Sequence, residues 1–312
     1  MAERRIISAS RRTDIPAHYA EWFLGRLAAG WCRVQHPYTK AWLDASLAPV
    51  DVVGLVLWSR DFGPLLSELP AIRRRYPLYC QFTITGHPRA LEPHAPPTDD
   101  AVAQARQLAK ALGPGSIVWR FDPIVHTQHG GPEATLDRFR RLCSELDGAT
   151  RRCTISFMSP YRRQTRAFAA RGLVAQEPSP ELRRELSTAI AELAAHHGMA
   201  VSACCNPDVV GDGVGRASCV DAGLLRGLGA DVPERWPSGA SRPGCGCDRS
   251  VDIGAYDTCV TGCAYCYANQ DHALARRNHT AHAPSSPSLV PAGSAPESDG
   301  SQRGRKGNAE MP

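Results

Sequence analysis

Three cysteines near the end of the chain have the spacing of a metal-binding loop. They are Cys259, Cys263 and Cys266, separated by three residues and then by two. Such short spacings let one loop wrap three thiolates around a single metal centre, and thiolates are the usual ligands of iron–sulfur clusters. Random placement of 12 cysteines in 312 positions would give this triplet only about 0.02 times. The spacing therefore predicts a metal site.

Two further cysteines, Cys245 and Cys247, precede the triplet and are candidates for a fourth ligand. Three thiolates alone leave one iron of a four-iron cluster without a protein ligand. A fourth thiolate would complete either a fully ligated electron-transfer cluster or a tetrahedral zinc site. We expect a 4Fe-4S cluster, with structural zinc as the alternative.

The other seven cysteines fall into two groups. One group could supply ligands to a second metal: Cys204, Cys205 and Cys219. Cys204 is the best placed of them because it ends a predicted strand. For Cys205, a buried thiol is the simpler interpretation. Disulfides are not expected in a reducing compartment. The remaining four lie in apolar or helical segments and are interpreted as buried, inert thiols: Cys32, Cys80, Cys143 and Cys153.

Strand-like and helix-like segments alternate through the first two-thirds of the chain. Repeated strand–helix units predict a parallel sheet, here a TIM-barrel-like (β/α) barrel, closed or partial. A doubly wound open sheet is the alternative, disfavoured because no Gly-x-Gly-x-x-Gly follows the first strand. The predicted strands are 5–10, 52–58, 78–85, 116–122, 153–158 and 199–204, with a further one at 33–35. The predicted helices are 19–29, 64–74, 99–112, 133–146, 180–197 and 221–228.

Composition sets the predicted domain limits and location. We expect a barrel domain over 1–240, a cysteine-rich iron–sulfur loop packed on it over 241–275, and a disordered tail over 276–312, where Pro, Ser and Gly dominate. A net charge of +5 gives no support for nucleic-acid binding. No apolar run approaches the roughly 20 residues that span a bilayer, and no signal segment is evident, so a cytoplasmic location without membrane contact is expected.

Charged side chains follow several predicted strands. The carboxyl ends of parallel strands carry the chemistry of a barrel, so we expect these side chains to converge. Arginine binds carboxylate or phosphate through a planar fork, which makes a set of four arginines a candidate anion site; the alternative is that they pair with neighbouring aspartates. Two of those aspartates are candidate bases. The candidate catalytic residues are Arg11, Arg12, Asp14, Arg60, Arg120 and Asp122.

The stretch from about Ile7 to Asn269 resembles the bacterial family of unknown function numbered 1848. The resemblance fixes membership without an activity, because the family has no assigned function. The matching pieces are Ser8–Pro16, Trp58–Arg60, Gln81–Gly86, Trp119–Ile124, Cys219–Asp221, Cys245–Cys247 and Asp252–Asn269.

The triplet itself resembles the cluster loop of radical S-adenosylmethionine enzymes, which often carries an aromatic residue at the position of Tyr265. That resemblance implies an open iron that binds S-adenosylmethionine, an electron donor such as a flavodoxin or ferredoxin, and a small-molecule or nucleotide-like substrate. Ser10, Tyr265 and Asn269 are the candidate cofactor-binding residues. One departure is plain: the loop follows all the strands instead of the first, and no Gly-Gly-Glu-like segment comes after it. Either the chain order is permuted or the cluster serves another purpose.

Overall fold

An all-parallel sheet of eight strands forms the centre of the computed structural model, which describes residues 4–158 and 162–290. Every neighbouring pair in the sheet is parallel. All six of the longer predicted strands belong to it and are therefore confirmed. The strands are β1 Arg5–Ala9, β4 Val52–Ser59, β5 Leu78–Thr83, β6 Ile117–Ile124, β8 Arg152–Phe157, β10 Ala200–Ala203, β11 Val214–Arg216 and β12 Val251–Asp252.

The strand order follows the chain with one exception. It runs β11-β10-β8-β6-β5-β4-β1-β12, so each strand lies beside its predecessor except β12, which pairs with β1 at the far edge. β1 is therefore an interior strand, with β4 on one side and β12 on the other. Within the described ranges, β11 and β12 are not paired with each other, so closure of the sheet is not shown.

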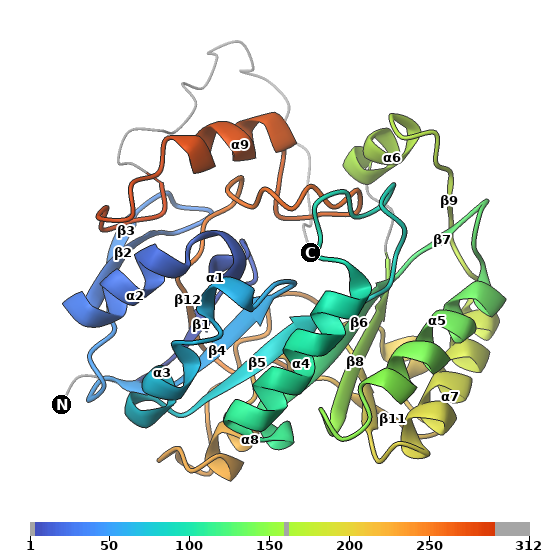
Figure 1. Cartoon of the computed structure of the whole chain (residues 1–312), viewed down its shortest axis with the longest axis horizontal. Helices are drawn as coiled ribbons and strands as arrows, with labels where there is room; N and C mark the ends of the chain where they lie inside the picture. Colours follow the sequence, from blue (N-terminus) through green and yellow to red (C-terminus); the bar gives the residue numbers. More distant parts are fainter. Residues whose placement is uncertain (1–3, 159–161, 291–312) are drawn as a thin grey trace.

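Helices cover one face of the sheet and build the main core. Five of them pack their apolar sides against strand residues such as Leu57, Phe82 and Trp119 (Figure 1). Every residue of β4 is buried, as predicted for a strand covered on both faces. The helices are α2 Ala20–Ala29, α3 Leu69–Arg75, α4 Thr98–Leu112, α5 Pro132–Glu145 and α7 Pro180–Ala195.

The opposite face of the sheet is covered by the chain between β11 and β12. Alternate strand residues, among them Ile6, Val56 and Tyr79, pack there against a cluster that includes the short helix α8 (Ala222–Gly227). Strand side chains point alternately to the two faces, so each strand contributes to both cores. The second core also contains five cysteines, which become important below.

Several short elements lie outside the sheet. The predicted strand at 33–35 exists as part of β2 (Trp31–Gln35), but it forms an antiparallel hairpin with β3 (Trp42–Ser46) and does not join the sheet. β7 (His126–Thr127) and β9 (Ala175–Gln176) form a second small ribbon. The additional helices are α1 Ile15–His18, α6 Arg162–Ala169 and α9 His272–Thr280. None of the described helices is long and apolar enough to cross a membrane.

The predicted disordered tail begins too early. Residues 276–280 belong to α9, which lies across the top of Figure 1, and the chain continues against the body to residue 290. The indole Nε1 of Trp22 donates to the carbonyl of Ser286 at 2.9 Å, and Leu289 is buried. Composition alone missed this because backbone contacts, not apolar periodicity, hold the segment. The rest of the predicted tail, 291–312, lies outside the described residues.

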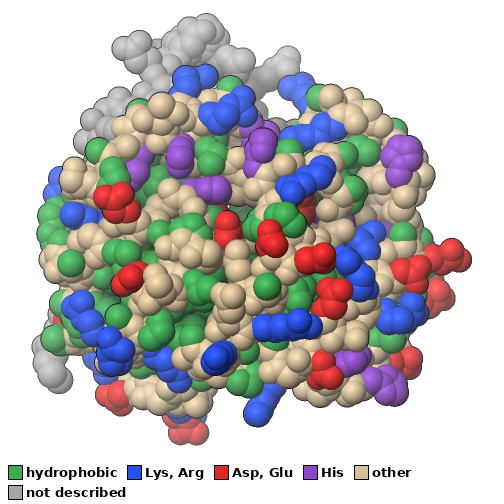
Figure 2. Space-filling view, in the orientation of Figure 1, with side chains coloured by type: hydrophobic (Ala, Val, Ile, Leu, Met, Phe, Trp, Pro, Cys, Tyr) green, Lys and Arg blue, Asp and Glu red, His purple; other side chains and the backbone are tan. Residues whose placement is uncertain are grey.

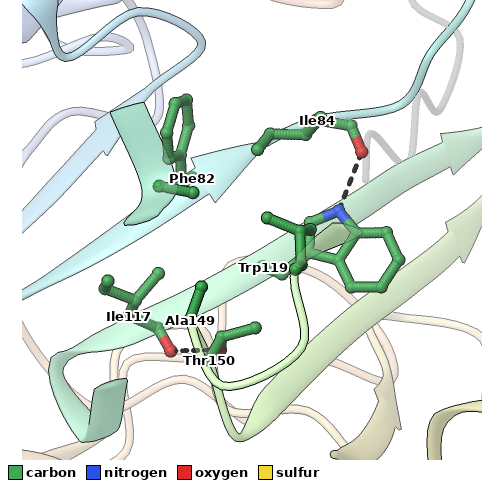
Figure 3. A pocket seen from close by; sticks show the side chains of 8 residues that line it. Phe82, Ile84, Ile117, Trp119, Ala149 and Thr150 are labelled. Atoms are coloured by element: carbon green, nitrogen blue, oxygen red, sulfur yellow. Dashed lines mark hydrogen bonds between the residues drawn. The ribbon is translucent and has the colours of Figure 1, made fainter. Parts of the chain in front are cut away.

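A small gap in the main core is a packing feature without room for a water molecule. Its walls include Phe82, Trp119 and Ala149, as Figure 3 shows. Its polar groups are already engaged: Trp119 Nε1 donates to the carbonyl of Ile84 at 2.8 Å, and Thr150 Oγ1 donates to that of Ile117 at 2.7 Å. The gap therefore offers nothing to a ligand.

Candidate functional site

The loop that carries the cysteine triplet lies over the carboxyl edge of the sheet. This triplet loop, residues 253–269, follows β12 and is held by segments that follow other strands. The Tyr19 hydroxyl, from the segment after β1, donates to the carbonyl of Thr258 at 2.8 Å. The amide of Ala264 donates to the carbonyl of Leu91, after β5, at 2.8 Å. Gln164, after β8, donates to the carbonyl of Tyr265 at 2.7 Å. The loop therefore lies where parallel sheets bind ligands.

Of the three cysteines of the triplet, Cys263 is buried and Cys259 and Cys266 are partly buried. Burial raises the pKa of Cys263 and Cys266, the latter to about 11. Burial is the largest single influence on Cys259 and acts to raise its pKa, but the combined effects of His18 and Thr261 lower the pKa of that thiol. Two of the three thiols therefore stay protonated at neutral pH, and metal binding here would release protons.

His18 is an unpredicted member of this site. Its Nε2 shares a hydrogen bond with Thr261 Oγ1 at 2.8 Å. Its ring lies 6.0 Å from that of His279, edge to face, and His279 in turn contacts Tyr19. Figure 2 shows histidine side chains gathered in the upper part of the face drawn. α9 thus adds imidazole rings beside the triplet loop.

Tyr265 connects the triplet loop to a buried ion pair through hydrogen bonds. Its hydroxyl donates a short hydrogen bond to Glu92 and accepts one from Arg60. Arg60 and Glu92 pair directly, with 2.9 Å between Nη1 and Oε2, and Thr85 Oγ1 donates to Glu92 at 2.6 Å. Residues that follow β4, β5 and β12 therefore meet in one polar network. Tyr265 is a positioning residue of the loop in this arrangement.

Burial and charge act in opposite senses on Glu92. Burial alone would raise the pKa of this carboxyl, but the adjacent Arg60 guanidinium, with help from His87, holds the pKa below its usual value. A buried carboxylate that stays ionised needs such compensation. Glu92 thus remains an acceptor for both the guanidinium and the Tyr265 hydroxyl.

Asp252 gathers Ser10, Arg11 and Arg12 at the end of β1. It accepts from the Ser10 hydroxyl at 2.5 Å and from the Arg11 amide at 2.8 Å, and pairs with Arg12 Nε at 3.1 Å. Gly254 permits this contact, because a Cβ there would lie 2.0 Å from Ser10 Oγ. The hydroxyl of Ser10, a predicted cofactor ligand, therefore bonds to Asp252 within the protein, and the guanidinium of Arg12 does the same.

Asp14 acts as a helix cap. It accepts from the Ala17 amide at the start of α1, from the Ser59 hydroxyl at 2.6 Å and from the Arg60 amide at 2.8 Å. Burial raises the pKa of this carboxyl in spite of these bonds. The residue joins the ends of β1 and β4, directly beneath the triplet loop.

Arg120 and Asp122 form an ion pair on β6, the one predicted pairing of an arginine with a nearby aspartate that occurs. Asp122 also accepts from the Ser156 hydroxyl. Arg120 Nη1 lies 3.1 Å from the sulfur of Cys219, and its guanidinium lies 5.0 Å from the ring of Trp58. This pair faces the second core instead of the triplet.

The four predicted arginines do not form one anion site. Arg12, Arg60 and Arg120 are held by internal carboxylates, with side chains 9%, 13% and 11% exposed. Arg11 is 25% exposed and lies 3.7 Å from Asp252. It is therefore the arginine best able to meet a ligand. The hydroxyl of the exposed Tyr267 donates to the Arg11 carbonyl at 2.7 Å, which ties the triplet loop to the same rim.

Cys245 and Cys247 lie away from the triplet. Both pack in the second core with Cys219, whereas Cys263 and Cys266 pack with Leu91 and Phe168. Asn269, the remaining candidate, donates to the carbonyl of Cys259 at 2.6 Å. Among the described residues, the triplet thus has no fourth cysteine beside it.

A cluster and a single ion would ask different geometries of the triplet. Within the described ranges, no three His, Cys, Asp or Glu side chains are already arranged to hold one metal ion. Two thiolates on one tetrahedral zinc lie about 3.8 Å apart, in near contact. A four-iron cluster instead takes one thiolate at each corner of a cube, so its ligands surround a common space. The thiols of the triplet interact through charge.

Three functional candidates escaped the sequence analysis: His18, Glu92 and Asp252. Asp252 lies in one of the matching segments, two residues before Gly254, but its residue type and spacing give it no role. Glu92 lies in a proline-rich segment and His18 in a short helix, and neither has a motif around it. Only their contacts reveal them.

The comparisons with known proteins identify a family. The model of the family described as Domain of unknown function (DUF1848) matches residues 6–268. The comparison with curated proteins gave no match, and neither did the comparison with solved structures.

Proposed function

The chain belongs to the DUF1848 family, and from its site we propose that it is an iron–sulfur enzyme of the radical S-adenosylmethionine type. One observation carries the proposal: three thiols in one loop lie over the carboxyl edge of an all-parallel sheet, fastened by segments that follow four other strands. That edge is where parallel α/β folds carry their chemistry.

The strand order supports a permuted barrel. Written as a circle, the order of the eight strands is that of a (β/α) barrel opened between β11 and β12. β12 is then the first strand in space although it comes last in the chain. Radical S-adenosylmethionine enzymes, which the triplet resembles, place their cysteine loop after the first strand. The departure seen in the sequence therefore disappears when strands are counted by position in the sheet.

The donor set supports an open coordination position. The triplet supplies three thiolates, and the other nine cysteines, all within the described residues, pack in the two cores. A cluster held by three thiolates keeps one iron free for a small ligand. When bound there, S-adenosylmethionine supplies radical chemistry that belongs to the cofactor.

The surrounding residues position the loop and select the ligand. Arg60, Glu92 and Tyr265 fix its far end, and Asn269 fixes the backbone of Cys259. Arg11 has the most exposed of the four guanidinium groups, which suits it to a carboxylate or phosphate. We therefore assign a small anionic or nucleotide-like substrate, with a redox protein such as a flavodoxin or ferredoxin as the electron donor.

A second candidate function follows from His18. Its hydrogen bond with the Cys259 thiol places an imidazole beside the triplet. Imidazole replaces thiolate in some iron–sulfur centres, so His18 would complete the shell and leave an electron-transfer cluster, or a Cys₃His zinc site. This alternative makes no use of S-adenosylmethionine.

Spectroscopy of the anaerobically reconstituted protein separates these functions. Iron and sulfide are measured first, and the electron paramagnetic resonance spectrum of the reduced protein is recorded before and after adding S-adenosylmethionine. We expect four irons per chain, a signal that shifts on addition, and formation of 5′-deoxyadenosine. The Cys263→Ser variant should lose the iron. A Cys143→Ser variant, which changes a buried thiol of the main core, should keep it.

The His18→Gln variant decides between the two candidates. If the cluster has an open iron, the variant keeps both its iron and its response to S-adenosylmethionine. A wild-type signal that ignores S-adenosylmethionine, together with a signal changed by His18→Gln, would establish the fully ligated centre and overturn the proposal. Zinc in place of iron, lost in Cys263→Ser, would do the same.

A further inference from the structure

Five cysteines outside the triplet meet on the other face of the sheet. They come from three separate parts of the chain: the end of β10, the segment after β11, and a loop just before β12. All five belong to the second core, and each lies among the described residues. This second cysteine group consists of Cys204, Cys205, Cys219, Cys245 and Cys247.

Four of these thiols are joined by direct contacts. The sulfurs of Cys204 and Cys205 are 3.7 Å apart. The thiol of Cys219 lies beside those of Cys204 and Cys247. The sequence of contacts is therefore Cys205, Cys204, Cys219, Cys247. Two thiolates on a tetrahedral zinc ion lie about 3.8 Å apart, so the spacing already seen matches that of ligands to one ion. Cys245 is not one of these four; its sulfur lies 3.9 Å from the hydroxyl of Ser241.

The backbone that carries these thiols is tightly held. The carbonyl of Cys219 accepts from the Tyr79 hydroxyl at 2.8 Å and from Gln81 Nε2 at 2.7 Å. The backbone at Gly246 lies against that of Ala217: a Cβ on Gly246 would lie 2.6 Å from the carbonyl oxygen of Ala217. Cys205 has φ of 55°, in the left-handed region. These contacts hold the backbones of the three cysteine-bearing segments next to one another.

Two guanidinium groups face the thiols. Arg120 Nη1 donates to the Cys219 sulfur at 3.1 Å, although Arg120 also pairs with Asp122. The guanidinium of Arg242 lies beside the thiols of Cys204 and Cys205. Neutral thiols do not need such partners, whereas buried thiolates do. Zinc with four thiolates carries a charge of about −2, which nearby guanidinium groups offset.

We propose that Cys204, Cys205, Cys219 and Cys247 bind one Zn²⁺ ion that holds the chain between β11 and β12 against the face of the sheet opposite the five main helices. Binding is an exchange without redox change: four S–H protons leave as four Zn–S bonds form. In the described structure the four thiols form a chain of contacts and not yet a shell. The end thiols of Cys205 and Cys247 would turn toward the middle pair on binding.

The open hollow beside the group offers a route for the ion. It has a volume of about 310 Å³ and is lined by Arg216, Cys245, Cys247 and Asp248, among others. Cys247 thus joins the surface to the buried thiols, with the acidic Asp248 next to it. The proposal goes beyond the function proposed above, and it stands whether or not the triplet holds a cluster.

The test uses a full-length chain in which Cys259, Cys263 and Cys266 are all changed to serine, so that no iron binds at the triplet. Purified without oxygen, this variant should retain about one zinc per chain. Replacing zinc by Co²⁺ should give the strong sulfur-to-cobalt absorption of a tetrahedral thiolate site. Adding Cys219→Ser should lower the zinc content to below about 0.1 per chain, whereas adding Cys143→Ser should leave it unchanged.

Other outcomes overturn the proposal and differ from failure of the triplet. Iron and sulfide in the triple variant would mean that the second group holds a cluster instead of zinc. A triple variant that binds neither zinc nor cobalt would show that these thiols are not a metal site. If the Cys219→Ser protein does not fold, the cobalt spectrum of the triple variant, with and without prior alkylation of its thiols, still decides. Loss of iron at the triplet affects none of these readouts.

Discussion

The guanidinium of Arg60 lies 2.9 Å from the carboxylate of Glu92, and both groups contact the hydroxyl of Tyr265, between two cysteines of the triplet. The pair joins the end of β4 to the segment after β5 and anchors a loop that arrives almost 200 residues later. Its burial makes it sensitive to loss of either partner, because the remaining charge would stay desolvated.

Glu92→Gln should therefore destabilise the fold. Breaking a buried ion pair on one side costs about 3 kcal/mol, because Arg60 remains buried without its counter-charge. Urea unfolding of the apo-protein measures the loss. The matched control is Asp231→Asn, which removes an exposed ion pair with Arg4 and should cost less than about 1 kcal/mol. Equal effects of the two changes would contradict the role of the Arg60–Glu92 pair.

Stability should fall as the pH drops through the acidic range, in part because of His87. Burial lowers the pKa of this imidazole to about 4, below its usual 6.5, with Glu92 opposing and Arg138 reinforcing the shift. Between these two values the unfolded chain binds the proton and the native chain does not. The free energy of unfolding therefore decreases as pH falls across that window, by up to about 1.4 kcal/mol per pH unit.

A His87→Gln variant isolates this contribution. Its amide can still donate to the carbonyl of Pro123, which His87 Nε2 contacts at 3.0 Å, but it does not titrate. Chemical denaturation at several pH values between about 4.5 and 6.5 should give a shallower pH dependence for the variant than for wild type. Glu92 is present in both proteins, so the titration of its unfolded carboxyl near about 4.3 contributes to both curves. Parallel curves would show that His87 does not carry the effect.

Gly254→Ala should disrupt the contact between β1 and β12. The new Cβ would lie 2.0 Å from Ser10 Oγ, the hydroxyl that donates to Asp252. We expect a loss of about 2 kcal/mol or more from strain and a broken buried hydrogen bond. Gly25→Ala is the control: nothing lies within 4 Å of its Cβ, and in α2 alanine should stabilise by about 0.5–1 kcal/mol. Thermal unfolding should show a lower melting temperature for Gly254→Ala and a higher one for Gly25→Ala than for wild type.

Asn269→Ala should weaken retention of the proposed cluster. The amide of Asn269 holds the carbonyl of Cys259 at 2.6 Å, and a hydrogen bond of about 1 kcal/mol corresponds to about a fivefold change in rate or affinity. Iron should be lost to a chelator about fivefold faster than from wild type. Arg106→Ala is the control: it removes side-chain bonds to one carbonyl, that of Glu145 at the end of α5, at 2.7 and 3.1 Å. If both variants lose iron alike, Asn269 has no special part in holding the loop.

The sequence alone determined the elements that depend on local pattern. Strand β4 is buried along its whole length, and its unbroken apolar run identified it. The helices α4 and α5 followed from periodicity in the same way. The spacing of Cys259, Cys263 and Cys266 within one loop also needed no tertiary information, because residues so close in the chain stay close in space.

The tertiary structure decided what depends on long-range contact. β11 and β12 have only three and two residues, too few for any periodicity, and they exist because neighbouring strands supply their hydrogen bonds. For the same reason the sequence could not assign each cysteine to the triplet or to the second cysteine group. Cys247 is closer along the chain to Cys259 than to Cys219, yet it contacts Cys219. Partner choice among charges is equally non-local, since Arg12 pairs with Asp252 and Arg60 with Glu92. Burial of a charge requires a counter-charge, but only the packing of the chain selects which one.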